Sequence, residues 1–255
     1  MAHAAWRGRL FLDAGAILYL GPGGAADEHA HNCVQVVWSL DGPFEVHVAG
    51  RRDERSAVVI PSAATHTFDA SGRTIALLLV ESHGARGAAL DAAVRDASLR
   101  DPAQVLPGVR VDDPRAVGAV VERVLTALGV TSATAPITAI TRRAIHYIEH
   151  HLDGVPRVRD VARELSVSTT RVTHLFTSEV GIPFRRFVLW TRIKHAVAAH
   201  RAGRDLTTAA IEAGFSDGAH FSRTFRAMFG LAPSFVLPLV EITGSMWSAT
   251  HPARR

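Results

Sequence analysis

The C-terminal half of the chain contains one pattern twice, and this repeat constrains the fold more than any other feature. Residues 158–184 align with residues 206–235 when small insertions are allowed in the turn and near the end. The pairs that match in character are Ala162 and Ala210, Ser166 and Gly214, Phe176 and Phe225, Gly181 and Gly230, and Pro183 and Pro233. In each copy a small alanine allows two helices to approach across a short turn. The spacing therefore predicts two helix-turn-helix units.

The second helix of each unit is predicted to bury one face and to expose the other. With Ser168 and Ser216 as the expected N-caps, helical spacing buries Val172, Leu175, Phe176 and Val180 in the first unit and Phe221, Phe225, Met228 and Phe229 in the second. The outward residues are Thr170, Arg171, Thr173, His174, Thr177 and Ser178, and then Ala219, Ser222, Arg223 and Arg226. Small hydroxyl residues beside long donors suit base edges and phosphates. A solvated helix produces one such face by accident, but two copies in register favour a nucleic-acid interface.

Charge is distributed unevenly between the two halves. Residues 1–136 carry 12 arginines against 15 acidic residues, whereas residues 137–255 carry 16 basic residues against 9 acidic ones. The repeat therefore lies in a basic half, as expected for a partner of an anionic polymer. Lys194 is the single lysine. The remaining cations are arginines, which suit bidentate contacts with phosphate or guanine but also follow from genomic base composition.

The first half is predicted to form a β-sandwich or barrel. Between residues 9 and 81, short runs rich in β-branched and aromatic residues alternate with turn signals such as GPGG, DGP and DASG. These runs are AILYL, VQVVW, FEVHV, AVVIP and TIALLLVE. Regular short strands of this kind are typical of sandwiches and barrels.

A helical segment and a linker separate the two regions. A helix over about 113–129 begins at Asp113-Pro114 and carries the aliphatic residues Val117, Val120, Val121, Val124, Leu125 and Leu128. This stripe has two interpretations that the sequence leaves open, a dimer surface or burial against the chain's own barrel. The TSATAP stretch at 131–136 is typical of a linker.

We therefore expect an α+β protein of two domains. The expected boundaries are 1–82 for a sensor-like β-barrel, 83–136 for a helical connector and potential dimerisation segment, 137–240 for an all-α domain of two helix-turn-helix units joined by a long helix, and 241–255 for a C-terminal tail.

Histidines gather in the predicted barrel. On a single strand, residues 29, 31, 33 and 35 share one face, so their side chains are predicted to point into one lumen. Together with His66, they offer nitrogen, sulfur and oxygen ligands to a divalent metal such as Zn, Ni, Mn or Fe. The chain has 14 histidines, so chance proximity in a polar lumen that holds a small ligand is the alternative.

The spacing of these residues resembles the first cupin motif. It runs Gly23, five residues, His29-Ala30-His31, three residues, Gln35, six residues and Gly42, with glutamine where metal-binding cupins carry glutamate. A weaker second motif places Pro61 and His66 at the family's spacing, with Ala63 in place of the usual glycine and Ala70 in place of the usual asparagine. The resemblance implies a cupin-like barrel in which His29, His31, Gln35 and His66 hold a metal or a ligand.

The stretch AGFSDGAHFSRTFRAMFGLAPSF resembles the second helix-turn-helix unit of the AraC family of bacterial transcription regulators. The resemblance covers about residues 137–240 and implies that the second helix of each unit enters the major groove. The implied DNA contacts are Thr170, Arg171, Thr173, His174, Ala219, Ser222, Arg223 and Arg226, with Arg223 as the main base reader. The stretch FRRFVLWTRIKHAVAAH resembles the long helix that sets the units roughly 34 Å apart. Arg185, Arg186, Arg192 or Lys194 on that helix are expected to reach phosphates.

The resulting hypothesis is a cytoplasmic, sequence-specific regulator that binds promoter DNA, works with RNA polymerase, responds to a small effector or metal, and potentially dimerises. No catalytic residues and no certain cofactor are assigned. The alternatives are a metal-dependent cupin oxygenase or isomerase with an accessory DNA-binding domain, and a DNA-architectural protein without a ligand. A lone Cys33 gives no reason for an oxidising compartment. The run LFLDAGAILYL after Arg7 and Arg9 is interrupted by Asp13, and no apolar run reaches the roughly 20 residues of a membrane span.

Overall fold

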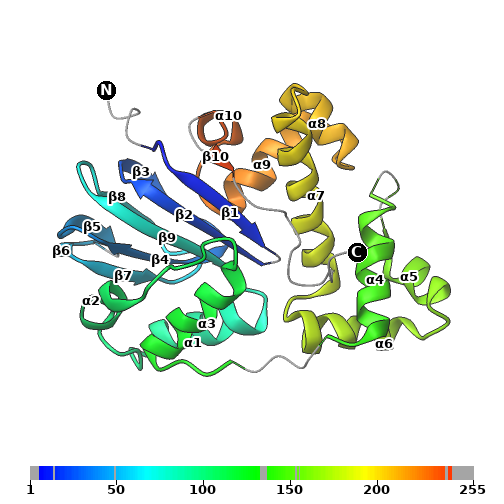
Figure 1. Ribbon diagram of the computed structural model, residues 1–255, viewed down its shortest axis with the longest axis horizontal. Helices are drawn as coiled ribbons and strands as arrows, with labels where there is room; N and C mark the ends of the chain where they lie inside the picture. The colour runs from blue at the N-terminus through cyan, green and yellow to red at the C-terminus, as the bar shows by residue number, and fades with distance from the viewer. Residues whose placement is uncertain are drawn as a thin grey trace.

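The computed structural model describes residues 6–13, 15–48, 50–132, 137–152, 154, 156–238 and 241–242. A β-rich body comes first along the chain and a helical body follows it, and the two lie side by side (Figure 1). The predicted linker falls mostly on residues 133–136, and most of the predicted tail on 243–255, both outside the described residues.

Ten strands form two sheets. The larger sheet has the order β10-β1-β2-β9-β4-β7 and the smaller one the order β3-β8-β5-β6. Their bounds are β1 Arg9–Asp13, β2 Ala16–Pro22, β3 Ala25–His29, β4 Cys33–Ser39, β5 Phe44–Val48, β6 Arg51–Arg55, β7 Ala57–Ile60, β8 His66–Asp69, β9 Thr74–Glu81 and β10 Glu241–Ile242. All neighbours are antiparallel except β1 and β10. The expected strands are confirmed, and the signal-like run of the N-terminal region forms β1 and β2.

The outer face of the larger sheet is covered by helices from the predicted connector. These are α1 Ala85–Arg95, α2 Pro102–Val105 and α3 Val117–Leu128, with a short 3-10 turn at Leu106–Gly108 (Figure 1). All six aliphatic residues of α3 are buried, and they cluster with residues on the outer face of β2, β4 and β9 such as Leu18, Val36 and Leu78. Of the two interpretations of this stripe, the structure supports burial in the core of the β-rich body. A dimer surface made of these residues is wrong, because the chain's own sheet already covers them.

We expect Val121→Arg to destabilise the protein severely, since the side chain is 1% exposed and a lone guanidinium would replace a packed isopropyl group. The loss should be about 3–5 kcal/mol of unfolding free energy, measured by urea denaturation. Thr126→Arg, at an exposed position of α3, is the matched control and should change stability little. A folded, stable Val121→Arg protein would contradict the assignment of α3 to the core.

The helical body contains both predicted units. Helix α4 Ala139–Glu149 precedes the first unit, which consists of α5 Val158–Glu164 and α6 Thr169–Leu175, continued by a π turn at Phe176–Val180. Helix α7 Phe184–Arg201 joins it to the second unit, made of α8 Leu206–Glu212 and α9 Gly218–Phe229, followed by α10 Pro233–Val236. Ser168 caps α6 as predicted, its hydroxyl accepting from the Arg171 N–H. The expected Ser216 cap is wrong: Asp217 caps α9 by accepting from the His220 N–H, while Ser216 bonds the Asp217 carboxylate.

The turns of the two units have the same backbone geometry. The amide of Val167 donates to the Ala162 carbonyl at 2.9 Å, and the amide of Phe215 donates to the Ala210 carbonyl at 3.0 Å. This bond pattern requires a left-handed residue after the first helix. Gly214 provides it at φ 86°, whereas the first unit uses Ser166 at φ 56°. The pairing of Ser166 with Gly214 in the repeat is thus a shared backbone conformation.

Ser166→Gly should therefore raise the free energy of unfolding by up to about 1 kcal/mol, because relief of roughly 1–2 kcal/mol of left-handed strain exceeds the entropic cost of glycine. Gly214→Ala should do the opposite and cost more than about 2 kcal/mol. The added methyl group would lie 2.3 Å from the Leu152 carbonyl oxygen as well as in a left-handed residue. Thermal denaturation of the two variants measures both effects. A destabilised Ser166→Gly protein would disprove the strain argument.

The two bodies share a continuous apolar core. Residues on the inner face of the larger sheet, such as Ile17 and Leu79, belong to the same buried cluster as Trp190, Phe225 and Phe229 of the helical body. Helices α9 and α10 lie beside the sheets (Figure 1). Among the described helices, none combines the length and the apolar character needed to cross a bilayer.

Candidate functional site

The outward faces of α6 and α9 are free in the described structure. Thr170, Arg171, Thr173 and His174 on α6 are exposed, as are Ala219, Arg223 and Arg226 on α9, and Ser222 is half-buried. The opposite faces hold Val172 and Leu175, and Phe221, Phe225, Met228 and Phe229, all of them buried. The predicted division of each helix into a core face and an open face is confirmed.

Several small hydroxyl groups on these faces are bonded to their own helix. The Thr173 hydroxyl donates to the Thr169 carbonyl at 3.0 Å, and the Ser222 hydroxyl donates to the Gly218 carbonyl at 2.9 Å. Each hydroxyl oxygen keeps acceptor capacity, but its proton is already used. The groups on these faces that extend furthest as donors are therefore Arg171, His174, Arg223 and Arg226.

The cations expected to reach phosphates from α7 have different environments. Arg185 is exposed, in agreement with the prediction. Lys194 is 4% exposed, and burial lowers its pKa to about 8. Arg192 is half-buried with Nε and Nη2 packed beside Gly214. Neither Arg192 nor Lys194 reaches the surface as expected, because α7 is packed on several sides at once.

Arg186 also departs from the prediction, because it bonds the β-rich body. Its Nε donates to Oε2 of Glu81 at 3.0 Å, its Nη2 donates to the same oxygen, and Nε1 of Trp190 donates there at 2.9 Å. Glu81 ends β9 and is 1% exposed. Burial alone would raise the pKa of this carboxyl, but the bonds from Arg186 lower it overall, so Glu81 is ionised at neutral pH. Arg186 joins the two bodies and in this arrangement does not face solvent as a phosphate contact must.

Three histidines meet at one end of the barrel. One ring nitrogen from each of His29, His31 and His66 lies within 4.8 Å of those of the others. The Nδ1 atoms contact backbone carbonyls two residues away, namely those of Asp27 at 2.7 Å, Cys33 at 3.0 Å and Ala64 at 2.9 Å. Nδ1 is then the protonated nitrogen, which leaves the Nε2 lone pairs available. A metal-binding histidine commonly donates its other ring N–H to a backbone carbonyl in this way, which fixes its tautomer and orientation.

Gln35 completes the group. Its Oε1 lies 2.9 Å from Nε2 of His31, while Nε2 of Gln35 and Nε2 of His66 are buried without a partner. With Nδ1 protonated, Nε2 of His31 and Oε1 of Gln35 are both acceptors and cannot bond each other. Their separation is that of two neighbouring ligands of one metal ion, so this arrangement suits a cation between them. Turning the amide by 180° would instead let its NH₂ group donate to His31. Burial lowers the pKa of His66 to about 4 and also lowers that of His31, so both imidazoles are neutral at pH 7.

The predicted strand geometry behind this cluster is partly wrong. Residues 29–35 do not form one strand: β3 ends at His29 in the smaller sheet, and β4 begins at Cys33 in the larger one. His29 instead pairs with His66 across β3 and β8. Within the described residues, the Cys33 thiol is not part of the histidine cluster, and Cys33 lies opposite Glu81 in the β4–β9 register. The histidines meet because the two sheets approach each other at this end.

The loop before His66, which resembles the second cupin motif, keeps a glycine-like backbone conformation although it contains no glycine. Ala63 stands where cupins have glycine, and it adopts φ 61°. Its amide donates to the His31 carbonyl at 2.9 Å, which ties the loop before His66 to the segment that carries His31. The unusual backbone of this alanine therefore holds two of the three histidines together.

One wall of the histidine cluster comes from the end of helix α9. Gly230 caps α9 at φ 80°, and a methyl group added there would lie 2.3 Å from Cδ2 and 2.7 Å from Nε2 of His29. The Asn32 amide donates to the Ala227 carbonyl at 2.9 Å. A cavity of about 70 Å³ adjoins His29 and Gln35, lined on one side by barrel residues and on the other by Phe225, Phe229, Leu231 and Val236. Sequence reasoning missed this contact, which joins segments about 200 residues apart.

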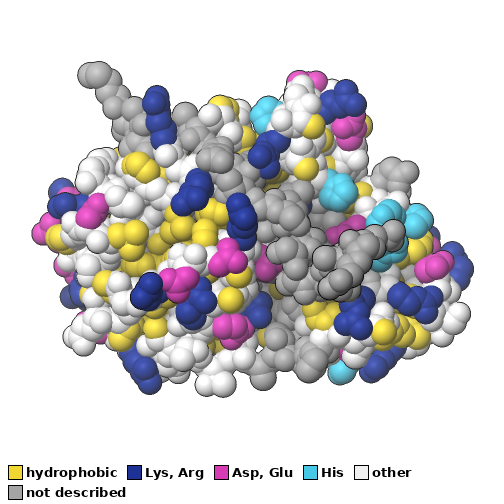
Figure 2. Space-filling view, in the orientation of Figure 1, with side chains coloured by type: hydrophobic (Ala, Val, Ile, Leu, Met, Phe, Trp, Pro, Cys, Tyr) yellow, Lys and Arg dark blue, Asp and Glu magenta, His cyan; other side chains and the backbone are white. Residues whose placement is uncertain are grey.

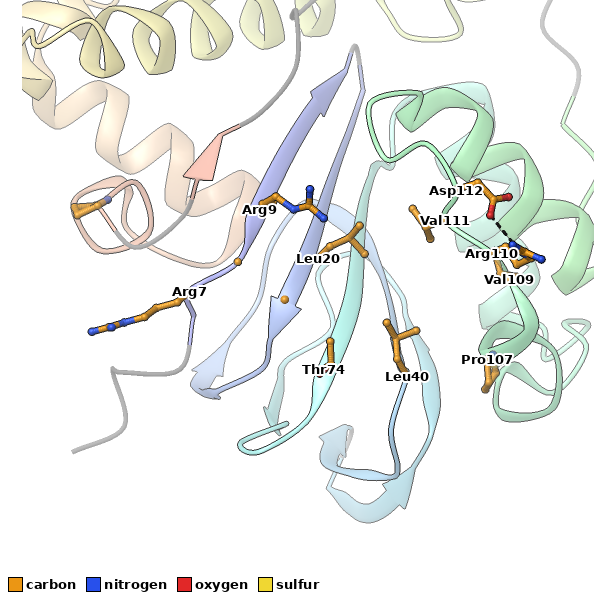
Figure 3. A pocket seen from close by; sticks show the side chains of 13 residues that line it. Arg7, Arg9, Leu20, Leu40, Thr74, Pro107, Val109, Arg110, Val111 and Asp112 are labelled. Atoms are coloured by element: carbon orange, nitrogen blue, oxygen red, sulfur yellow. Dashed lines mark hydrogen bonds and ion pairs between the residues drawn. The ribbon is translucent and has the colours of Figure 1, made fainter.

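A second depression lies outside the barrel. This open groove of about 920 Å³ runs between β1, β2 and the segment 107–112 (Figure 3). Leu20, Leu40 and Val111 give it an apolar floor, and Arg110 bonds Asp112 at its rim. Hydrophobic side chains gather over this face of the β-rich body with charged ones scattered among them (Figure 2). It contains none of the predicted site residues.

Comparisons with known proteins agree with the helical geometry. Residues 161–237 match the family described as a helix-turn-helix domain. The chain is 32% identical over 101 residues to the arabinose operon regulatory protein of Salmonella typhimurium, a match covering 39% of this chain and 36% of that protein. It is 34% identical over 91 residues to the transcriptional activator RhrA of Rhizobium meliloti, covering 34% and 29%. These matches span about a third of the length of the curated relatives.

Among solved structures, ToxT from Vibrio cholerae is similar over 88% of this chain and 98% of that one, with 14% identity and a TM-score of 0.44. The family match lies in the half that carries the open faces of α6 and α9. Residues 161–237 therefore form a helix-turn-helix domain, and the chain is similar over about a hundred residues to the arabinose operon regulatory protein.

Proposed function

We propose that the protein is a sequence-specific, DNA-binding transcription regulator in which α6 and α9 enter successive major grooves. The observation that carries this proposal is the pair of open helix faces, each backed by a buried apolar face and each belonging to one copy of a repeated unit. The curated relatives that match this half are named as regulators, which supports the same conclusion. A DNA-architectural role fits less well, because such proteins commonly insert large apolar side chains between base pairs, and the exposed faces of α6 and α9 carry none.

The barrel is the proposed sensor. His29, His31 and His66, with Gln35 as an oxygen ligand, would hold a divalent metal such as Zn, Ni, Mn or Fe, and the adjoining cavity would take a small effector. A bound metal would supply a positive charge and an open coordination position to that cavity. Because four residues of the helical body close the cavity, the site suits a sensor rather than an oxygenase or isomerase, which must exchange substrate and product.

The remaining partners follow from this role. Promoter DNA and RNA polymerase are the proposed macromolecular partners, and the cytoplasm is the proposed location. A homodimer would have to use a surface other than the aliphatic stripe of α3, which is buried.

If Arg223 reads guanine, Arg223→Ala should weaken binding to a duplex selected from a random library by about 1–3 kcal/mol. Binding to unselected duplex should change much less. Arg185→Ala should weaken both duplexes to a similar extent and reduce the slope of log K against log salt by about one, as expected for a phosphate contact. Fluorescence anisotropy across a salt series measures all four affinities. An equal loss on both duplexes for Arg223→Ala would make it a phosphate contact.

For the barrel, the purified protein reconstituted with Zn²⁺ should bind one ion per chain. His66→Ala should lose that ion, since it removes a ligand whose Nε2 is buried without another partner. His83→Ala, outside the cluster, is the control and should retain it. Elemental analysis after desalting measures the stoichiometry. Equal metal content in all three proteins, or none in the wild type, would refute the metal site.

A further inference from the structure

The helical body covers the histidine cluster and also fixes the segment that carries it. Gly230 and Ala227, at the end of α9, contact His29 and Asn32. Asn32 follows His31, so the bond from its amide to the Ala227 carbonyl sets the path of the short connection between β3 and β4. His29 is the most exposed of the three histidines, and Gly230 packs closely against its ring.

This contact makes the ligand geometry depend on the position of α9. Ligand atoms must be held within tenths of an ångström for tight metal binding, and His29 and His31 sit on separate elements that α9 helps to align. When the two bodies separate, His29 loses the wall formed by Gly230 and the connection at Asn32 loses its hydrogen bond. The separated form is therefore the weaker metal binder.

We propose that a divalent metal at His29, His31 and His66 stabilises the docked arrangement of the barrel and the second helix-turn-helix unit, so that metal binding and domain separation oppose each other. This inference rests on the proposed metal site. A ligand that binds one of two conformations more tightly shifts the equilibrium towards it, and the coupling acts equally in both directions. The docked form also keeps Arg186 on Glu81, so the metal would control whether that guanidinium is free.

Cys33 provides a natural reporter of domain separation. It is the chain's one cysteine, it is fully buried, and it shares a sheet face with Glu81, whose carboxylate bonds Arg186 and Trp190 of α7. The thiol therefore faces the helical body and becomes accessible when α7 moves away. The rate at which a chromogenic disulfide reagent labels Cys33 measures that opening.

The test uses the full chain with Zn²⁺ alone as the probe. In the wild type, saturating Zn²⁺ should slow Cys33 labelling about tenfold or more. In His66→Ala, Zn²⁺ should leave the rate unchanged, which excludes protection by Zn²⁺ that binds the thiol independently of the histidine site. Unchanged labelling in a wild type that demonstrably binds Zn²⁺ would overturn the coupling and leave the metal site intact.

The reciprocal measurement uses variants remote from the ligands. Arg186→Met leaves the Glu81 carboxylate without its cation and should loosen the docking, so we expect faster labelling and about tenfold weaker Zn²⁺ affinity in a chelator competition. Arg185→Met, one residue earlier and exposed, is the control and should match the wild type. Equal Zn²⁺ affinities for the two variants, with labelling accelerated only in Arg186→Met, would contradict the proposal. A wild type that binds no Zn²⁺ would refute the metal site and the coupling together.

Discussion

The rest of the structure depends on one apolar contact, in which the second helix-turn-helix unit packs against the inside of the β-rich body and closes it. Phe225 and Phe229 lie on the core face of α9 and also line the cavity next to His29 and Gln35. The same side chains therefore hold the reading helix in its unit and close the candidate sensor site. Burying such aromatic surfaces is the dominant favourable term in folding and association. A change in the cavity therefore acts directly on α9, the helix that we propose reads DNA.

The polar contacts at this junction make the docking specific. A buried carboxylate such as Glu81 adds little net stability when paired, but it is costly to leave without a partner. Arg186 and Trp190 satisfy it from a single helix, so α7 has one favourable position on β9. Lys194 is buried further along the same helix, and burial lowers its pKa to about 8. It is a second buried charge, and any packing that left it without favourable neighbours would be penalised. The bodies are thus oriented by groups that would be strongly penalised in any other arrangement.

The sequence predicted local features well and contacts between distant segments poorly. The repeat identified both units, down to the equivalence of Ser166 and Gly214, because a left-handed turn residue and a buried alanine leave local signals. The strand β6 was missed because its five residues are all exposed and all charged, so it has no apolar alternation. Motif spacing brought His29, His31, Gln35 and His66 together, although the strand parity used to explain it was wrong. Neither spacing nor periodicity could show that Arg186 bonds Glu81, because that pair is 105 residues apart.

The central claim is that two helices of one chain read DNA in adjacent major grooves. Methylation interference on a duplex selected by the full-length protein tests it most directly, since the probe modifies guanine N7 on the major-groove edge. The account predicts two clusters of interfering guanines about 10 base pairs apart on one face of the duplex, one of them lost in Arg223→Ala. A single cluster, or uniform weak interference along the duplex, would contradict it.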